Sequence, residues 1–98
     1  MDQFHLLTII AEESLTTHIQ QEVEQLGAKG YTLSVVSGKH MSNLRDSPWT
    51  GGNVKIETVV TEATCRRILQ HLQHKYFDRY AMIAFHHPVS VLRTEHFS

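Results

Sequence analysis

The sequence contains little of what marks several large classes of protein. Its 98 residues include one cysteine, two prolines and five glycines, and its formal net charge is −1. A single cysteine cannot form an intrachain disulfide, which agrees with a reducing cytoplasm. A net charge so close to zero provides no basic face for nucleic acid, so we expect no nucleic-acid partner.

Long apolar runs and a secretory signal are also lacking. No run approaches the roughly 18 apolar residues of a transmembrane helix. The N-terminal apolar run has no basic flank, unlike a signal peptide, and we interpret it as a first strand. With 41% hydrophobic and 19% charged residues, the composition is that of an ordinary globular protein. We therefore predict one cytoplasmic domain over residues 1–98.

The first half of the chain alternates strand and helix patterns. Residues 4–11 form an unbroken apolar run, which is typical of a central strand. Ser14 is the predicted N-cap of a helix with one apolar stripe, and Gly27 is the predicted stop of that helix. Residues 31–37 alternate and are rich in β-branched side chains, which predicts a second strand.

Residues 38–53 show no period and contain Pro48, Gly51 and Gly52, which break regular structure. A loop of about sixteen residues is uncommon in a compact domain and is usually functional. We therefore interpret this stretch as a functional loop between two strands.

The second half repeats the alternation of strand and helix. We predict a strand at 54–61, a helix capped by Thr61, and a strand at 81–85. His86, His87 and Pro88 are expected to end that strand, with a short terminal strand at 89–93. The order β-α-β-β-α-β predicts an α+β fold of the ferredoxin-like type.

Right-handed crossovers place both helices on one face of such a sheet. The other face would then be uncovered, and an apolar uncovered face indicates an interface between subunits. The side chains expected there are His5, Leu7, Ile9, Val36, Val59 and Met82. We therefore predict an oligomer.

Three segments resemble the nitrogen-regulatory PII proteins. Residues 30–33, followed by Val36 and Gly38, resemble the strand that enters the T-loop of that family. Residues 54–60 resemble the strand that leaves this loop. Residues 93–95 resemble the beginning of the family's C-terminal arginine motif.

Two further segments, 38–45 and 75–81, are similar to one branch of the family. That branch contains the PII-like proteins associated with bicarbonate transporters and with carboxysome gene clusters. The resemblance covers nearly the whole chain. It implies that residues 38–53 are the T-loop, and that the protein is a homotrimer whose uncovered sheet faces line its centre.

The resemblance also implies a function. PII proteins bind adenine nucleotides in clefts between subunits, beneath the T-loop, whose conformation reports the ligand to a partner protein. This chain would regulate inorganic-carbon uptake or carboxysome-linked carbon fixation. Its partner would be a membrane bicarbonate transporter or a carboxysome component, to which it would be recruited. Its ligands would be a nucleotide and bicarbonate, with no further cofactor.

The resemblance implies binding residues in the strands, at the loop base and near the C-terminus. A phosphate requires cations and backbone amides, and a small anion such as bicarbonate requires one or two donors. Taken alone, the loop cations would be ordinary solvated charges. The predicted nucleotide-binding residues are Thr32, Gly38, Lys39, Glu57, Val59, Arg79 and Arg93. The predicted bicarbonate-binding residues are Lys39, Ser42, Asn43 and Arg45.

Two departures from the family bear on the choice of nucleotide. The stretch that corresponds to the family's glycine-rich B-loop, residues 77–82, contains no glycine. Val91 occupies the position of the earlier of the family's two C-terminal arginines. Fewer groups are therefore available for phosphate, and we expect ADP or AMP, or a cyclic nucleotide, to be preferred over ATP.

Eight histidines leave one alternative open. His71 and His74 lie on one helix without a carboxylate or thiolate at zinc-site spacing, and the adjacent His86 and His87 point to opposite faces of a strand. Cys65 lies on an apolar helix stripe, so we interpret it as a core residue. We expect no metal site, no catalytic residue and no enzyme. The alternative that the histidines favour is a metal-responsive trimer of the divalent-cation-tolerance type. A second alternative is a small enzyme subunit or a structural interaction domain without any ligand.

Overall fold

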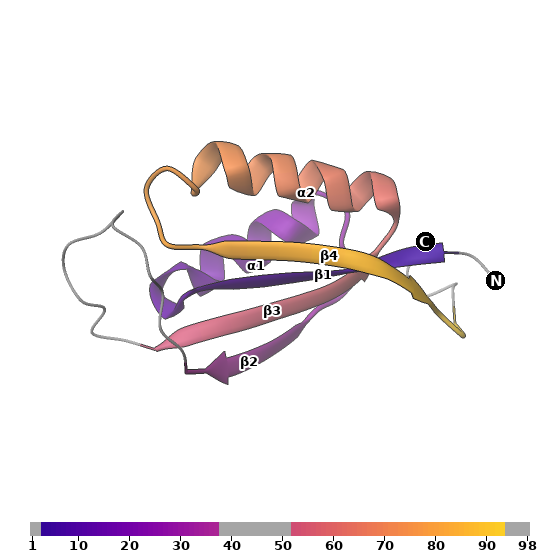
Figure 1. The fold of residues 1–98 in the computed structure, drawn as a ribbon, viewed down its shortest axis with the longest axis horizontal. Coiled ribbons are helices and arrows are strands. Elements are labelled where there is room, and N and C mark those ends of the chain that lie inside the picture. The colour runs from indigo at the N-terminus through magenta and orange to yellow at the C-terminus, as the bar shows by residue number, and fades with distance from the viewer. Residues whose placement is uncertain (1–2, 38–51, 94–98) are drawn as a thin grey trace.

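The structure is a computed structural model that describes residues 3–37 and 52–93. Figure 1 shows a four-stranded sheet with both helices on one of its faces. The elements are β1 (Gln3–Glu12), the 3-10 turn η1 (Glu13–Leu15), α1 (Thr16–Gln25), β2 (Thr32–Val36), β3 (Asn53–Val60), α2 (Glu62–Lys75) and β4 (Ile83–Ser90). The predicted ferredoxin-like α+β fold is confirmed.

The strands lie in the order β2-β3-β1-β4, and all neighbouring pairs are antiparallel. β1 is therefore central, because it pairs with β3 on one side and with β4 on the other. Its composition fits this place, since a strand covered on both edges needs no polar residues to protect an edge.

The hydrophobic core lies between the helices and the sheet. From β1 it contains Leu7 and Ile9, and from the helices it contains Ile19, Ile68 and Leu72, all with 0% exposure. The apolar stripes of the two helices thus meet the sheet as their spacing predicts. Within the described ranges, no helix combines the length and apolar character needed to cross a membrane.

The predicted content of the uncovered face was wrong for several residues. Leu7 and Ile9 belong to the core beneath the helices, Met82 packs against that core, and His5 lies 3.8 Å from Glu62 of α2. The reason is that the odd-numbered residues of β1 face the helices. Residues 4–11 are apolar on both sides of the strand, so alternation could not show which set faces the helices.

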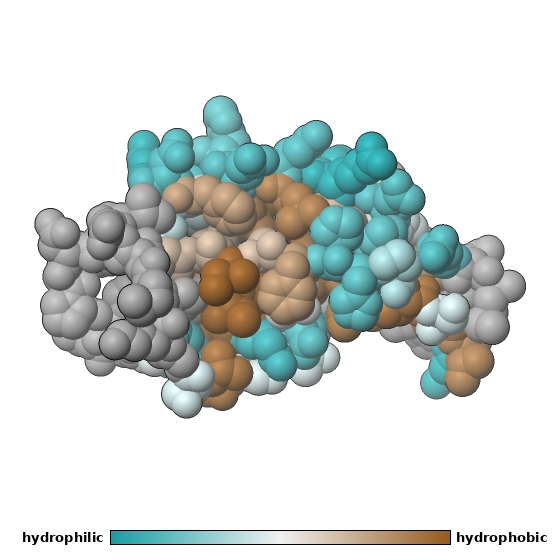
Figure 2. Space-filling view, viewed as in Figure 1, coloured by the Kyte–Doolittle hydropathy of each residue, from teal (hydrophilic) through white to brown (hydrophobic). Residues whose placement is uncertain are grey.

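The uncovered face instead carries the other set of side chains. Thr8 and Ile10 of β1 lie opposite Phe85 and Ile83 of β4, which are 48% and 45% exposed. Figure 2 shows apolar side chains gathered at the surface below α2. Val59 extends this set on β3, opposite Leu6.

Two helix boundaries follow from local chemistry. Thr61 caps α2 as predicted, because its side chain accepts a hydrogen bond of 3.2 Å from the amide of Thr64. Gly27 has φ +123°, a value that favours glycine, and follows α1 as predicted. The predicted cap at Ser14 was wrong, because its hydroxyl donates to the carboxylate of Glu12 at 2.7 Å.

β4 also differs from its prediction. It runs without interruption from Ile83 to Ser90, through His86, His87 and Pro88, where two separate strands were expected. Among the described residues, β4 is an edge strand and pairs only with β1. Proline is tolerated on an edge strand because the missing amide can face away from the neighbouring strand.

Candidate functional site

The end of the sheet that flanks residues 38–51 gathers several elements. β2 ends here, β3 begins here, and β1 passes into η1 and α1. The amide of Glu13 donates to the carbonyl of Gly52 at 2.9 Å, and the amide of Gly52 donates to Glu13 Oε2 at 3.3 Å. These two bonds fix the start of β3 against the end of β1.

Two buried polar side chains lie at the same end. Glu12 and Asn53 are opposite each other in the β1–β3 pair and are 7% and 6% exposed. Asn53 Oδ1 is buried and has no hydrogen-bond partner among the described residues. A buried amide oxygen without a partner is costly, so this atom is a candidate acceptor for a ligand. Sequence reasoning missed Asn53, because it treated the residue as part of the loop.

Three of the predicted nucleotide-binding residues lie together on the uncovered face. Thr32 and Glu57 are opposite each other in the β2–β3 pair, and Val59 follows on the same side of β3. Lys55 Nζ lies 3.8 Å from Glu57 Oε1 and adds a positive charge beside them. The strands thus form a half-exposed polar surface.

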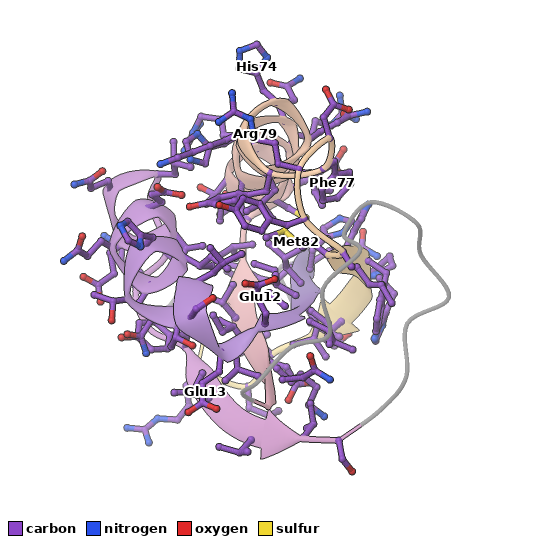
Figure 3. All side chains as sticks on the ribbon, turned by 90° about the vertical axis from the view of Figure 1, so that its left-hand side faces the viewer. Glu12, Glu13, His74, Phe77, Arg79 and Met82 are labelled. Carbon is purple, nitrogen blue, oxygen red and sulfur yellow. The ribbon has the colours of Figure 1, made fainter. Side chains whose placement is uncertain are left out.

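The turn between α2 and β4 is compact. The amides of Arg79 and Tyr80 both donate to the carbonyl of Tyr76 at 2.9 Å. Phe77, Tyr80 and Met82 pack against the core, while Arg79 is exposed. Figure 3 shows this turn above Glu12 and Glu13, at the end of the molecule that faces the viewer.

One chain does not bring all the predicted residues together. Arg79 precedes β4 and Arg93 follows it. At about 3.3 Å per residue, the strand separates them by roughly 25 Å. Gly38, Lys39, Ser42, Asn43 and Arg45 lie outside the described residues.

A charged cluster joins the two helices on the outer side of the core. Glu22 of α1 accepts hydrogen bonds from Tyr76 Oη at 2.7 Å and from Lys75 Nζ, and His71 Nε2 lies 2.9 Å from the same carboxylate. Burial pushes the pKa of Glu22 up, but the hydrogen bonds from Lys75, Tyr76 and His71 outweigh it and lower the pKa below its ordinary value. Burial, and then the Glu22 carboxylate, raise the pKa of Tyr76.

A second cluster of reactive side chains lies near the beginning of α2. The cluster consists of His5 from β1, Cys65 from α2 and His86 from β4, and one ligand atom from each lies within 4.8 Å of the other two. Burial, and then the nearby Glu62 carboxylate, raise the pKa of the Cys65 thiol. Sequence reasoning missed this cluster because its members are far apart in the chain. Only the β1–β4 register places His86 on the face that also carries His5.

Similarity to known proteins extends over the whole chain. The family model described as "Nitrogen regulatory protein P-II" matches residues 4–96. A PII-like signalling protein of Thermus thermophilus is 42% identical over 100% of both chains, with a TM-score of 0.85.

Two structures of CPII from Thiomonas intermedia K12 are each 25% identical to the chain. The one bound to ADP, AMP and acetate matches 97% of this chain and 94% of its own, with a TM-score of 0.83. The one bound to ADP, AMP and bicarbonate matches 98% of each chain, with a TM-score of 0.81.

Proposed function

The chain belongs to the nitrogen regulatory P-II protein family, and we propose that this PII-like regulatory protein senses ADP or AMP together with bicarbonate. The observation that carries the proposal is the similarity to CPII, which is described as bound to ADP, AMP and bicarbonate and matches nearly the full length of the chain. No catalytic step is part of the proposal.

The placement of the candidate residues supports a site between subunits. Thr32, Glu57 and Val59 would contact the nucleoside, and Arg79 and Arg93 would contact phosphate. Because the two arginines lie at opposite ends of β4, a site that uses both must take them from two chains. We therefore propose a homotrimer with nucleotides bound at its subunit boundaries.

The compact turn after α2 supports a preference for ADP or AMP over ATP. A polyphosphate is usually held by free backbone amides. Here the amides of Arg79 and Tyr80 are already bonded to the carbonyl of Tyr76. Fewer amide donors remain, so the third phosphate of ATP would add little binding free energy.

For bicarbonate we propose the cations and polar groups of the loop, namely Lys39, Ser42, Asn43 and Arg45, together with Asn53. Bicarbonate carries one hydroxyl group, which donates a hydrogen bond. Asn53 Oδ1 is a buried acceptor without a partner among the described residues, so it can receive that bond. The ligand would then satisfy an atom that is otherwise costly to bury.

The proposed physiological role is regulation of inorganic-carbon uptake or of carboxysome-linked carbon fixation. A signal that combines the adenylate state with bicarbonate suits a process that consumes both energy and inorganic carbon. The partner would be a bicarbonate transporter or a carboxysome component, bound through residues 38–53.

Isothermal titration and thermal shift with ADP, AMP and ATP, each with and without bicarbonate, test this proposal. We expect ADP and AMP to raise the melting temperature as ligand concentration exceeds Kd, ATP to act more weakly, and bicarbonate to tighten ADP binding. Arg93→Ala should weaken ADP binding about tenfold, in line with the loss of one charged hydrogen bond. Arg66→Ala, on the exposed side of α2, is the matched control. If none of the three nucleotides binds, the proposal is wrong.

A further inference from the structure

The side chains of His5, Cys65 and His86 form a cluster on the helix-covered side of the sheet. The Nδ1 atoms of His5 and His86 are 3.0 Å apart, and their ring centroids are separated by 5.1 Å. The Cys65 thiol completes the group: one ligand atom from each of the three residues lies within 4.8 Å of the other two. The cluster lies away from the sheet end that flanks residues 38–51, because α2 begins at the opposite end of the molecule (Figure 1).

The fold itself assembles this group. His5 lies opposite Pro88 in the β1–β4 pair, so His86, two residues before Pro88, is its diagonal neighbour on the same face. Cys65 lies in the first turn of α2 and is 1% exposed. The side chain of His5 is 12% exposed, while His86 is exposed and gives an ion access from solvent.

We propose that His5, Cys65 and His86 bind one zinc ion. Imidazole and thiolate are both ligands of zinc, and three protein ligands with water in the fourth position make a tetrahedral zinc site. Zn–N bonds of about 2.0–2.1 Å place two such nitrogens roughly 3.3 Å apart, close to the separation of the Nδ1 atoms here. The Cys65 sulfur must move about 1 Å toward the two imidazole nitrogens to form a Zn–S bond of about 2.3 Å.

Glu62 supplies a further element of such a site. Its Oε2 lies 3.8 Å from Nε2 of His5, on the side of the ring away from His86. This distance is too long for a hydrogen bond, but an approach of about 1 Å would let the carboxylate accept one from Nε2. Such a bond would keep the proton on the outer nitrogen and leave the inner nitrogen free for the metal.

The proton balance of binding is simple. Zinc takes the lone pairs of Nδ1 of His5 and of His86, and it replaces the proton of the Cys65 thiol. The proton of the Nδ1···Nδ1 hydrogen bond moves to Nε2 of the exposed His86 through exchange with water. Each zinc ion bound therefore releases one net proton, which comes from the thiol.

Titration of the untagged full chain with zinc chloride, in competition with a chromophoric chelator, tests the site. We expect one tightly bound zinc ion per chain. His86→Ala should weaken binding by more than the roughly 10–100-fold that loss of an outer-shell partner costs. His87→Ala is the matched control, because the adjacent side chain points to the opposite face of β4. Since His86 is exposed, the His86→Ala variant tests the site without removing a core residue.

Cobalt binding gives an independent readout. A Co²⁺-loaded protein should show a thiolate-to-metal charge-transfer band that Cys65→Ser abolishes, with far-ultraviolet circular dichroism confirming that the variant is folded. Glu62→Gln should weaken zinc binding about 10–100-fold and retain the band. Zinc binding that is unchanged in both His86→Ala and Cys65→Ser, no charge-transfer band, or binding of Cu⁺ with no binding of Zn²⁺ would each overturn the proposal.

Discussion

At the residue scale, the carboxylate of Glu22 connects the two helices. Its carboxylate is 13% exposed and contacts His71, Lys75 and Tyr76 of the α2 segment. A carboxylate that is nearly buried needs such partners, because desolvation alone would favour its neutral form. The hydrogen bonds and ion pairs of Glu22 thus link α1 to α2 at the outer edge of the apolar core, where a charge can be partnered.

We predict that Glu22→Gln lowers the free energy of unfolding by about 1–2 kcal/mol at neutral pH, since hydrogen bonds to a charged group are lost. The lowered pKa of Glu22 means that its contribution is present above the ordinary value of 4.5 and is lost as the pH falls through the folded-state pKa. Urea unfolding of both proteins should therefore show a difference that shrinks under acid. Glu24→Gln, at an exposed position of α1, is the control, and a difference independent of pH would contradict the assignment.

At the element scale, α2 depends on its cap. Thr61 satisfies the amide of Thr64, and the hydroxyl of Thr64 in turn receives a hydrogen bond from Arg67 at 2.9 Å. The helix also brings Cys65 and Glu62 to the proposed zinc site from its first turn. Fraying of this turn would therefore weaken the proposed zinc site as well as the helix.

We predict that Thr61→Ala costs about 1 kcal/mol of stability, through the loss of one capping bond. Chemical denaturation measures the loss, and zinc affinity should fall with it if the first turn frays. Thr17→Ala, in the exposed part of α1, removes a hydroxyl without removing a cap and should be close to neutral. An equal loss in the two variants would show that the cap is not the cause.

The helices could be predicted from the sequence, whereas the pairing of the strands could not. Helix stripes, the Thr61 cap and the Gly27 stop are local signals, so the order of elements and the fold could be predicted. The continuity of β4 through Pro88 could not, because only the sheet order shows that β4 is an edge strand. The neighbours Thr32 and Glu57, and the meeting of His5 with His86, depend on strand register. A pattern of residues in one strand does not contain that information.

At the scale of the whole molecule, the uncovered face decides how chains associate. Ile83 and Phe85 are about half-exposed there, beside Ile10. Exposed apolar side chains that gather on one face mark an interaction surface. The faces of three chains can cover one another in a closed ring, which leaves no apolar sheet face in contact with water.

We predict that light scattering after gel filtration gives three times the mass of one chain. Phe85→Lys should shift the protein toward the monomer, because it buries a charge at the proposed centre. Val35→Lys is the control, since this exposed side chain lies on the other side of the sheet. A wild-type monomer, or a Phe85→Lys trimer of unchanged stability, would contradict the assignment of this face.

The central position of β1 also limits the rate at which the chain folds. The first strand is flanked by β3 and by the last strand, and His5 meets His86 across 81 residues of sequence. Contacts between such distant segments require a large loop to close before they contribute energy, and folds rich in them fold slowly. The β2–β3 pair and the two helices can form earlier from nearby residues. The step that joins β4 to β1 would then be the slow one, and it would also complete the group formed by His5, Cys65 and His86.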